Sequence, residues 1–280
     1  MPQVRRSMLY VPGDNPRALA KAPGLAADVV VVDLEDAVAP DRKDEARDAA
    51  RDALAALAHG KEVALRVNGA DTLWHEADVA LAGELGVAVL LPKVREAVDV
   101  ERLAARLSAP IWPMMETAEG ILNALAVAKA AAATGAGALV AGTNDLASEL
   151  GATPGADRAA LSTALQTIVL AARAAGLDAI DGVMNDIADE AGLVAEARAG
   201  RALGMTGKSV VHPAQVGPVN EVFAPSADEV ARARAVVGAM EAAEQEGRSV
   251  ATLDGRMVER LHADAARRTL ALADAIASRA

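Results

Sequence analysis

Short runs of apolar residues recur along the whole chain, and most of them end in a charged or hydrogen-bonding residue. Alanine-rich segments with apolar residues at helical spacing separate the runs. Runs that can be buried on both faces are typical of strands in a parallel sheet. Eight such runs predict a closed α/β barrel of the (β/α)8 TIM-barrel type, with strands in residues 7–13, 29–36, 63–68, 87–93, 111–117, 138–145, 177–182 and 208–213.

The polar residues that end these runs are the candidates for chemistry, because the active site of such a barrel lies where its strands end. We expect them to lie around one opening. They are Asp33, Glu35, Asp36, Arg66, Asn68, Lys93, Glu116, Thr117, Asn144, Asp145, Asp181 and His212.

Composition narrows the class of protein. Aromatic residues make up only 1% of the chain, so its core is aliphatic and it lacks the aromatic platforms on which nucleic-acid bases stack. The net charge of −11 also disfavours binding to nucleic acid and to anionic membranes. Because the chain has no cysteine, disulfides and thiolate nucleophiles are excluded.

The sequence also indicates a location and a division into two parts. It shows no secretory signal pattern and no apolar run of about 20 residues, so we expect a cytoplasmic protein without a membrane span. After the eighth run, a proline-containing segment leads into helix-forming sequence over 227–246. We predict a barrel over 1–223 and a C-terminal helical extension over 224–280, which packs on its own barrel or, as we favour, on a neighbouring subunit.

Glu116 and Asp145 are the strongest candidates for a metal site. Each follows an apolar run, in the strings MMET and AGTND, on consecutive predicted strands. Two carboxylates that converge there, together with waters and substrate oxygens, suit Mg²⁺. The alternative is that each residue only caps the helix that follows it. Their position on neighbouring strands favours the metal.

Arg66 ends the run ALRVN. A guanidinium binds carboxylates through paired hydrogen bonds and can stabilise an enolate. The alternative is that Arg66 pairs with Asp33, Glu35 and Asp36, which would then support Arg66 and metal-bound waters from behind. The two roles are compatible.

Four further residues have weaker patterns. For Lys93 and Lys208, electrostatic support is favoured over a Schiff-base role. His212 is favoured as structural, because no histidine spacing typical of zinc sites is present. Asp254 belongs to an Asp-Gly turn in the extension, and by its own pattern it is an ordinary turn residue.

Several longer strings occur in order along the chain: RRSMLYVPGD, VVVVDLEDAVAPDRKDEAR, ALRVNG, METAEGI, GTNDLASELG, GKSVVHPAQV and LDGRMVE. Together they resemble the citrate lyase beta-subunit-like family of the HpcH/HpaI aldolase superfamily, which includes citryl-CoA and malyl-CoA lyases and malyl-CoA thioesterases. The resemblance implies a (β/α)8 barrel with a helical extension, a homotrimer, and Mg²⁺ as cofactor.

The resemblance also implies roles for residues of this chain. Glu116 and Asp145 correspond to the Mg²⁺ ligands, with Glu116 also at the substrate. Arg66 corresponds to the residue that binds the substrate carboxylate or thioester oxygen. Asp254 corresponds to a general base that reaches the barrel of a neighbouring subunit.

The predicted function is Mg²⁺-dependent Claisen-type cleavage or condensation of a 3-hydroxyacyl-CoA, with an acyl-CoA thioester and a small 2-oxoacid as partners. The alternatives are a malyl-CoA-type thioesterase, a CoA-independent 2-oxoacid aldolase, and a non-catalytic acyl-CoA-binding subunit of a lyase complex. A basic strip of Arg5, Arg6, Arg17 and Lys21 at the barrel mouth would favour CoA, whose phosphates need cations.

Overall fold

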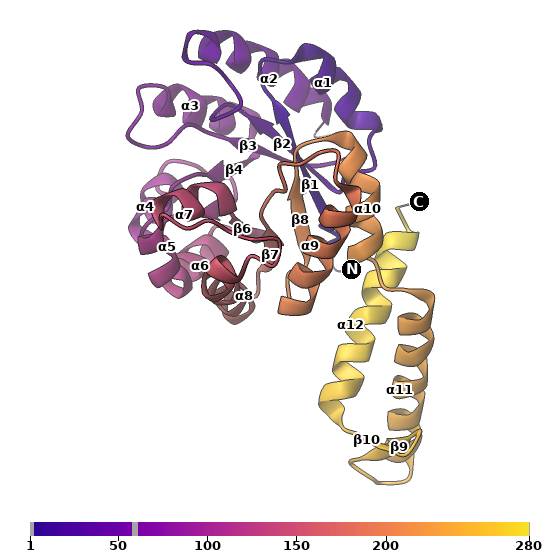
Figure 1. Cartoon of the computed structure of the whole chain (residues 1–280). Coiled ribbons are helices and arrows are strands. Elements are labelled where there is room, and N and C mark those ends of the chain that lie inside the picture. Colours follow the sequence, from indigo (N-terminus) through magenta and orange to yellow (C-terminus); the bar gives the residue numbers. More distant parts are fainter. Residues whose placement is uncertain (1–2, 58–60, 280) are drawn as a thin grey trace. The chain divides into compact units, whose positions relative to one another are not determined.

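The computed structural model describes residues 3–57 and 61–279 of the chain. Eight parallel strands close into a barrel in which each strand pairs with its neighbours in sequence, and β1 pairs with β8 (Figure 1). This confirms the predicted (β/α)8 fold. The strands are β1 (Ser7–Pro12), β2 (Val29–Asp33), β3 (Glu62–Arg66), β4 (Ala88–Leu91), β5 (Ile111–Met115), β6 (Ala138–Ala141), β7 (Asp178–Asp181) and β8 (Gly207–Val210).

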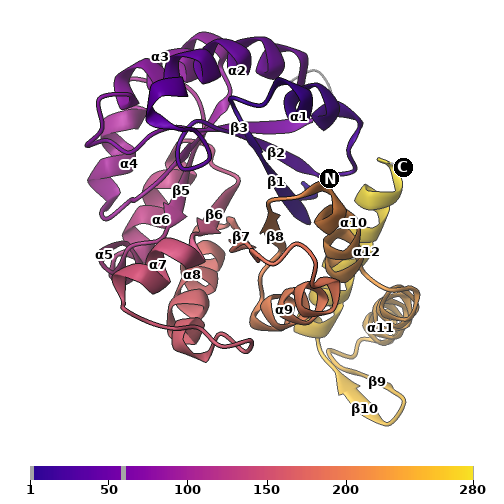
Figure 2. The ribbon, with the colours of Figure 1, turned by 45° about the horizontal axis from the view of Figure 1, so that its top comes forward.

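Helices surround the strands on the outside (Figure 2). Glycines in the left-handed conformation end several of them, for example Gly86 and Gly176. The helices are α1 (Pro16–Lys21), α2 (Lys43–Leu57), α3 (His75–Leu85), α4 (Ala97–Ala104), α5 (Ala118–Leu122), α6 (Ala124–Ala133), α7 (Thr143–Glu149), α8 (Ser162–Ala175), α9 (Glu190–Leu203) and α10 (Pro213–Phe223), with 3-10 turns at Ala22–Gly24, Pro40–Arg42 and Ala159–Leu161.

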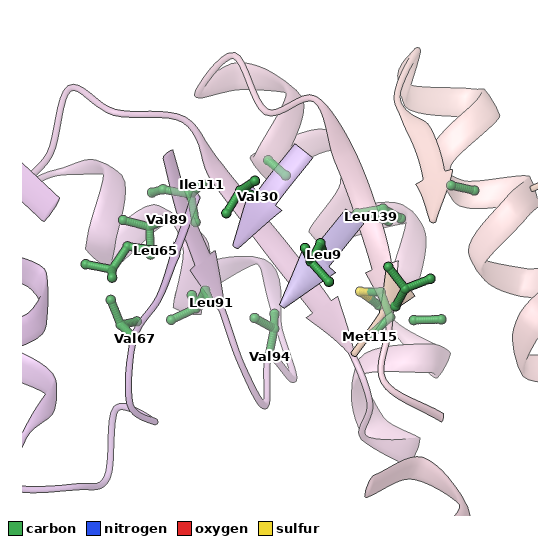
Figure 3. Close-up of a cluster of buried hydrophobic side chains, with 14 of the residues drawn as sticks. Leu9, Val30, Leu65, Val67, Val89, Leu91, Val94, Ile111, Met115 and Leu139 are labelled. Atoms are coloured by element: carbon green, nitrogen blue, oxygen red, sulfur yellow. The ribbon is translucent and has the colours of Figure 1, made fainter. Parts of the chain in front are cut away.

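The core has two layers because strand residues alternate in direction. In β2, Val29 and Val31 belong to the cluster inside the barrel, whereas Val30 and Val32 belong to the cluster between the strands and the helices. Figure 3 shows part of the outer cluster, with Val30 beside side chains of neighbouring strands. All four valines are fully buried, which explains why the strand reads as a continuous apolar run.

Two arginines lie at the end of the barrel where the strands begin. Arg5 pairs with Glu62 and Asp178, which start β3 and β7, at 2.7 Å from each. Arg6 pairs with Asp28, directly before β2. Since the strands begin at this end, the prediction that Arg5 and Arg6 line the mouth is wrong: they hold the opposite end of the barrel together.

The proline-containing segment after β8 is itself a helix, α10, which the sequence pattern did not indicate. Pro213 stands at its first position, where the missing backbone N–H is not needed. Pro218 lies inside the helix. The buried residues Val219 and Phe223 lie on the same helix, so burial of apolar surface stabilises it despite the proline.

The described residues divide into two compact units, and Arg5–Phe223 is the first. The second contains α11 (Ala227–Gln245), a hairpin of β9 (Ala251–Leu253) and β10 (Arg256–Val258), and α12 (Arg260–Ala277). Met240 and Ala263 belong to its small separate core. Packing of this extension on a neighbouring subunit stays a prediction. Among the helices of the described residues, none combines the length and apolarity needed to cross a membrane.

Candidate functional site

A cavity of about 300 Å³ opens at the carboxyl ends of the strands. Side chains from seven of the eight strands or the loops that follow them reach it, as expected for the active end of a barrel. The lining residues are Tyr10, Pro12, Asp33, Asp36, Ala37, Arg66, Met114, Glu116, Ala141, Gly142, Thr143, Asn144, Asp145, Val183, Asn185 and Val211.

Arg66 is held in a fixed orientation at the end of β3. Its Nε and Nη2 donate to the two carboxylate oxygens of Asp33 at 2.7 and 2.6 Å, and its guanidinium lies 5.0 Å from the ring centroid of Tyr10. Burial alone would lower the pKa of Arg66, but the charge of Asp33 raises it well above its ordinary value, so the guanidinium stays charged. The two hydrogen bonds to Asp33 use only two of the five N–H groups of the guanidinium.

Side-chain hydrogen bonds of Asp33 and Lys43 hold the segment after β2 in place. Asp33 accepts a hydrogen bond from the backbone N–H of Glu35, and buried Lys43 donates to the carbonyls of Leu34 and Glu35. Glu35 in turn lies 3.1 Å from Nη1 of Arg66. The predicted acidic cluster is therefore assembled around Arg66, and Lys43 is a supporting residue that the strand-end pattern did not reveal.

Glu116 follows β5 and is 2% exposed. Its Oε1 accepts a hydrogen bond of 2.7 Å from the backbone N–H of Lys93. A Cβ atom at Gly142 would clash with this carboxylate, so glycine is required beside it. Burial, followed by the charge of Glu35, raises the pKa of Glu116 to about 8. In the protein without a bound metal ion, this pKa favours the protonated form of Glu116 at neutral pH.

Asp145 lies in the first turn of α7 and lines the same cavity as Glu116, with its side chain 40% exposed. The two predicted metal ligands are thus brought together. Among the residues that the structure describes, no group of three or more histidine, aspartate or glutamate side chains is arranged to hold a metal. A pair of carboxylates still fits Mg²⁺, which takes one or two carboxylates and completes its octahedron with waters and substrate oxygens.

The electrostatics of the cavity fit a divalent cation. Burial and then the charge of Glu35 raise the pKa of Glu116, and a cation bound beside it would favour its ionised form. The buried oxygens of Glu35 accept no hydrogen bond from the described residues, although cations lie within ion-pair distance. A bound divalent cation would supply the positive charge that this group of carboxylates lacks.

Lys208 and Asp181 are fully buried, and they belong to a charge network outside the cavity lining. Lys208 pairs with Asp181 and with Glu196, and Arg158 donates to both carboxylate oxygens of Asp181. This network joins the end of β7 to β8 and α9. The ammonium of Lys208 is therefore taken up by structural partners, in agreement with the favoured supporting role.

Two other candidates differ in their relation to the cavity. His212 is exposed directly before α10, is not part of the cavity lining, and donates its backbone N–H to the side chain of Gln215. Asn144, which lines the cavity, forms a reciprocal pair of side-chain hydrogen bonds with Asn185, and this pair joins the first turn of α7 to the loop after β7. Asn185 and Tyr10 are cavity residues that the strand-end rule missed, since Tyr10 lies within its strand and Asn185 several residues beyond its own.

Asp254 belongs to the second unit. It is exposed at the turn between β9 and β10, with a φ of 48°. This left-handed conformation is one that aspartate tolerates better than most residues. Arg17 and Lys21, the other two cations of the predicted basic strip, are exposed on α1 and are not part of the cavity lining.

The fold and this cavity together define a class: (β/α)8-barrel proteins with a charged arginine and a carboxylate pair at the strand ends, suited to a divalent cation and an anionic substrate. The sequence profile described as HpcH/HpaI aldolase/citrate lyase matches residues 6–213. The chain belongs to this family.

Its relatives include proteins with two named activities. A (3S)-malyl-CoA thioesterase of Cereibacter sphaeroides is 49% identical over 276 residues, which cover 98% of this chain and 96% of the relative. A citrate lyase subunit beta of Leuconostoc mesenteroides subsp. cremoris is 34% identical over 287 residues, covering 98% and 94%. Both alignments span the barrel and the extension.

A solved structure supports the same grouping. The CitE protein of Mycobacterium tuberculosis, in complex with magnesium, acetoacetate and coenzyme A, is 32% identical and has a TM-score of 0.81. The match covers 97% of this chain and 98% of that protein. Family membership therefore connects this fold with a malyl-CoA thioesterase and with a protein that binds magnesium and coenzyme A.

Proposed function

We propose that this protein is a Mg²⁺-dependent enzyme that acts on a malyl-CoA-type thioester, and that hydrolysis of the thioester is its main reaction. The observation that carries the proposal is a single cavity lined by Arg66, Glu116 and Asp145. A fixed guanidinium and a carboxylate pair meet there, which suits a substrate with a carboxylate and a carbonyl oxygen near a cation.

Glu116 and Asp145 would hold Mg²⁺. The bound ion would act as a Lewis acid on a substrate oxygen. Glu116 is fixed through the Lys93 backbone N–H, so its carboxylate is aimed before the ion arrives. The Asp145 side chain is 40% exposed, so substrate and water would have access to an ion held beside it.

Arg66 would bind the oxygen on which negative charge develops. Asp33 holds its plane, and Tyr10 packs against its face, so the donors are oriented before the substrate binds. Such preorganised donors stabilise an oxyanion more than they stabilise the neutral carbonyl of the substrate. Asp33, Glu35 and Asp36 would support Arg66 and metal-bound waters, as predicted from the sequence.

The choice of hydrolysis rests on similarity. The thioesterase relative is 49% identical, whereas the lyase subunit is 34% identical, over almost the whole chain in both cases. In hydrolysis, water attacks the thioester carbon, the C–S bond breaks, and the CoA thiolate takes a proton. The products are free CoA and a hydroxydicarboxylic acid.

The carbon–carbon lyase activity predicted from the sequence is the second candidate, because the lyase relative also covers nearly the whole chain. In that reaction the substrate hydroxyl loses its proton, and the bond between the hydroxyl-bearing carbon and the α-carbon of the thioester breaks. The α-carbon of the thioester enolate that is left then takes a proton. Malyl-CoA would give acetyl-CoA and glyoxylate by this route.

Asp254 would move the proton in either reaction, from a neighbouring subunit of a homotrimer. This part of the proposal rests on the motif LDGRM and on the exposure of the turn that carries Asp254. A CoA-independent aldolase and a non-catalytic acyl-CoA-binding subunit are the outcomes that would remain if no thioester is turned over.

The test is a mass-spectrometric screen of acyl-CoA thioesters, malyl-CoA among them, with the purified full chain and with or without Mg²⁺. Free CoA and malate are expected, and only with Mg²⁺. Acetyl-CoA with glyoxylate would establish the lyase instead. Glu116→Gln, which removes a proposed Mg²⁺ ligand, should not turn the thioester over. Turnover that persists in this variant or without Mg²⁺ would refute the proposed chemistry.

A further inference from the structure

Lys93 stands in an unusual backbone conformation beside the carboxylate pair. It follows β4 and Pro92, and its φ is 55°, in the left-handed region that residues with a Cβ atom rarely adopt. In this conformation its backbone N–H points at Oε1 of Glu116, 2.7 Å away. Strained backbone of this kind is found where surrounding structure or function requires it.

The side chain of Lys93 places a positive charge between two carboxylates. Its Nζ lies 3.2 Å from Oε1 of Glu35 and 3.9 Å from Oδ2 of Asp145. Glu35 is 5% exposed, and its oxygens accept no hydrogen bond from other described residues. The ammonium therefore neutralises a buried carboxylate and also lies within ion-pair distance of a proposed metal ligand.

The ammonium has room to leave Asp145. The Lys93 side chain is 47% exposed, and Lys93 also lines a second cavity of about 670 Å³, together with residues such as Arg95 and Arg102. This second cavity is lined by the loop before α3, the start of α3, the segment after β4, and α4. Lys93 therefore contacts Asp145 and also lines the second cavity.

We propose that the Lys93 ammonium is a resident counter-cation of Glu35 and Asp145: it pairs with both in the metal-free protein, and a divalent cation displaces it from Asp145. The inference rests on the proposed function, because it takes Glu116 and Asp145 as the metal ligands. A divalent ion and an ammonium next to the same carboxylate repel each other. Lys93 is therefore a positioning residue whose charge sets how tightly the ion binds.

The test is calorimetric titration of Mg²⁺ into the full chain at fixed ionic strength. Lys93→Met removes the charge and keeps an unbranched side chain with a Cβ atom, so the backbone strain is unchanged. We expect Lys93→Met and Lys93→Gln to bind Mg²⁺ about five- to tenfold more tightly than the wild type. Lys93→Arg keeps the charge and should bind Mg²⁺ like the wild type.

Arg95→Met is the matched control, because it removes the same charge from an exposed residue two positions away. Its Mg²⁺ affinity should stay within about twofold of the wild type, since solvent and salt screen its charge. Equal tightening in Arg95→Met and Lys93→Met would mean that net charge alone acts, and it would overturn the proposal.

The outcomes separate this inference from the proposed function. If the wild type binds Mg²⁺ and the neutral Lys93 variants bind it equally or more weakly, the counter-cation role is wrong and the metal site stands. If neither the wild type nor the variants bind Mg²⁺, the metal assignment is wrong and the role of Lys93 falls with it. Thermal melting of each variant with and without Mg²⁺ shows that the variants are folded and gives a second measure of affinity.

Discussion

Replacing Glu116 with glutamine should make the metal-free protein more stable while abolishing its response to Mg²⁺. The reason lies in the buried carboxyl group, whose pKa rises from its ordinary value of 4.5 to about 8 in the folded protein. A raised pKa stabilises the folded state fully below pH 4.5, and this contribution is lost as the pH rises toward 8. Glutamine does not titrate, is close in shape to the protonated acid, and can still accept the Lys93 N–H.

The size of the effect follows from the pKa shift. Each unit corresponds to about 1.4 kcal/mol, so at pH 7 the wild type has lost about 3 kcal/mol relative to a non-titrating side chain. At pH 5 the loss is only about 1 kcal/mol. Glu116→Gln should therefore raise the melting temperature at pH 7 by roughly 5–10 °C, and by much less at pH 5.

The assay is thermal or urea unfolding in EDTA at both pH values, at one protein concentration, followed by addition of Mg²⁺. Glu119→Gln is the matched control, because Glu119 is exposed only three residues away and its loss should change stability by less than about 0.5 kcal/mol. The reasoning is refuted if Glu116→Gln destabilises the metal-free protein at pH 7. It is also refuted if Mg²⁺ stabilises this variant as much as the wild type.

Three further changes test other parts of the site. Asp33→Ala removes the partner of a buried guanidinium and should cost about 3–5 kcal/mol in urea unfolding, whereas an unchanged midpoint would mean that Arg66 does not depend on Asp33. Gly142→Ala places a methyl group against Glu116, so Mg²⁺ binding measured by calorimetry should weaken; unchanged binding would refute the close packing. Inactive Asp254→Ala and inactive Arg66→Ala chains, when mixed into common trimers, should regain turnover, and verified mixed trimers without activity would contradict a base supplied in trans.

The barrel was predictable because burial on both faces leaves a direct mark on the sequence. Val29 to Val32 are all apolar for this reason, and the polar residues that follow them mark the carboxyl end of the strand. The longer strings that occur in order along the chain, such as METAEGI and LDGRMVE, then indicated the family. The predicted strand continued to residue 36, but β2 ends at Asp33, because the later residues turn to hold Arg66.

Other features depend on contacts between distant residues, which periodicity does not reveal. Arg5 and Arg6 look like free cations in the sequence, yet each is matched by acidic residues far along the chain. Asn185 reaches the cavity through its partner Asn144, 41 residues away. The hairpin around Asp254 consists of strands of three residues each, too short to show an alternating pattern.

The position of the metal is the central claim, and one measurement tests it most directly: calorimetric titration of Mg²⁺ into the wild type, Asp145→Asn and Glu119→Gln. Glu119 is exposed and is not part of the cavity lining, so Glu119→Gln removes one carboxylate charge outside the proposed site. We predict a single Mg²⁺ per chain, bound at least about tenfold more weakly by Asp145→Asn and nearly unchanged in Glu119→Gln. Wild-type affinity in Asp145→Asn would contradict the account.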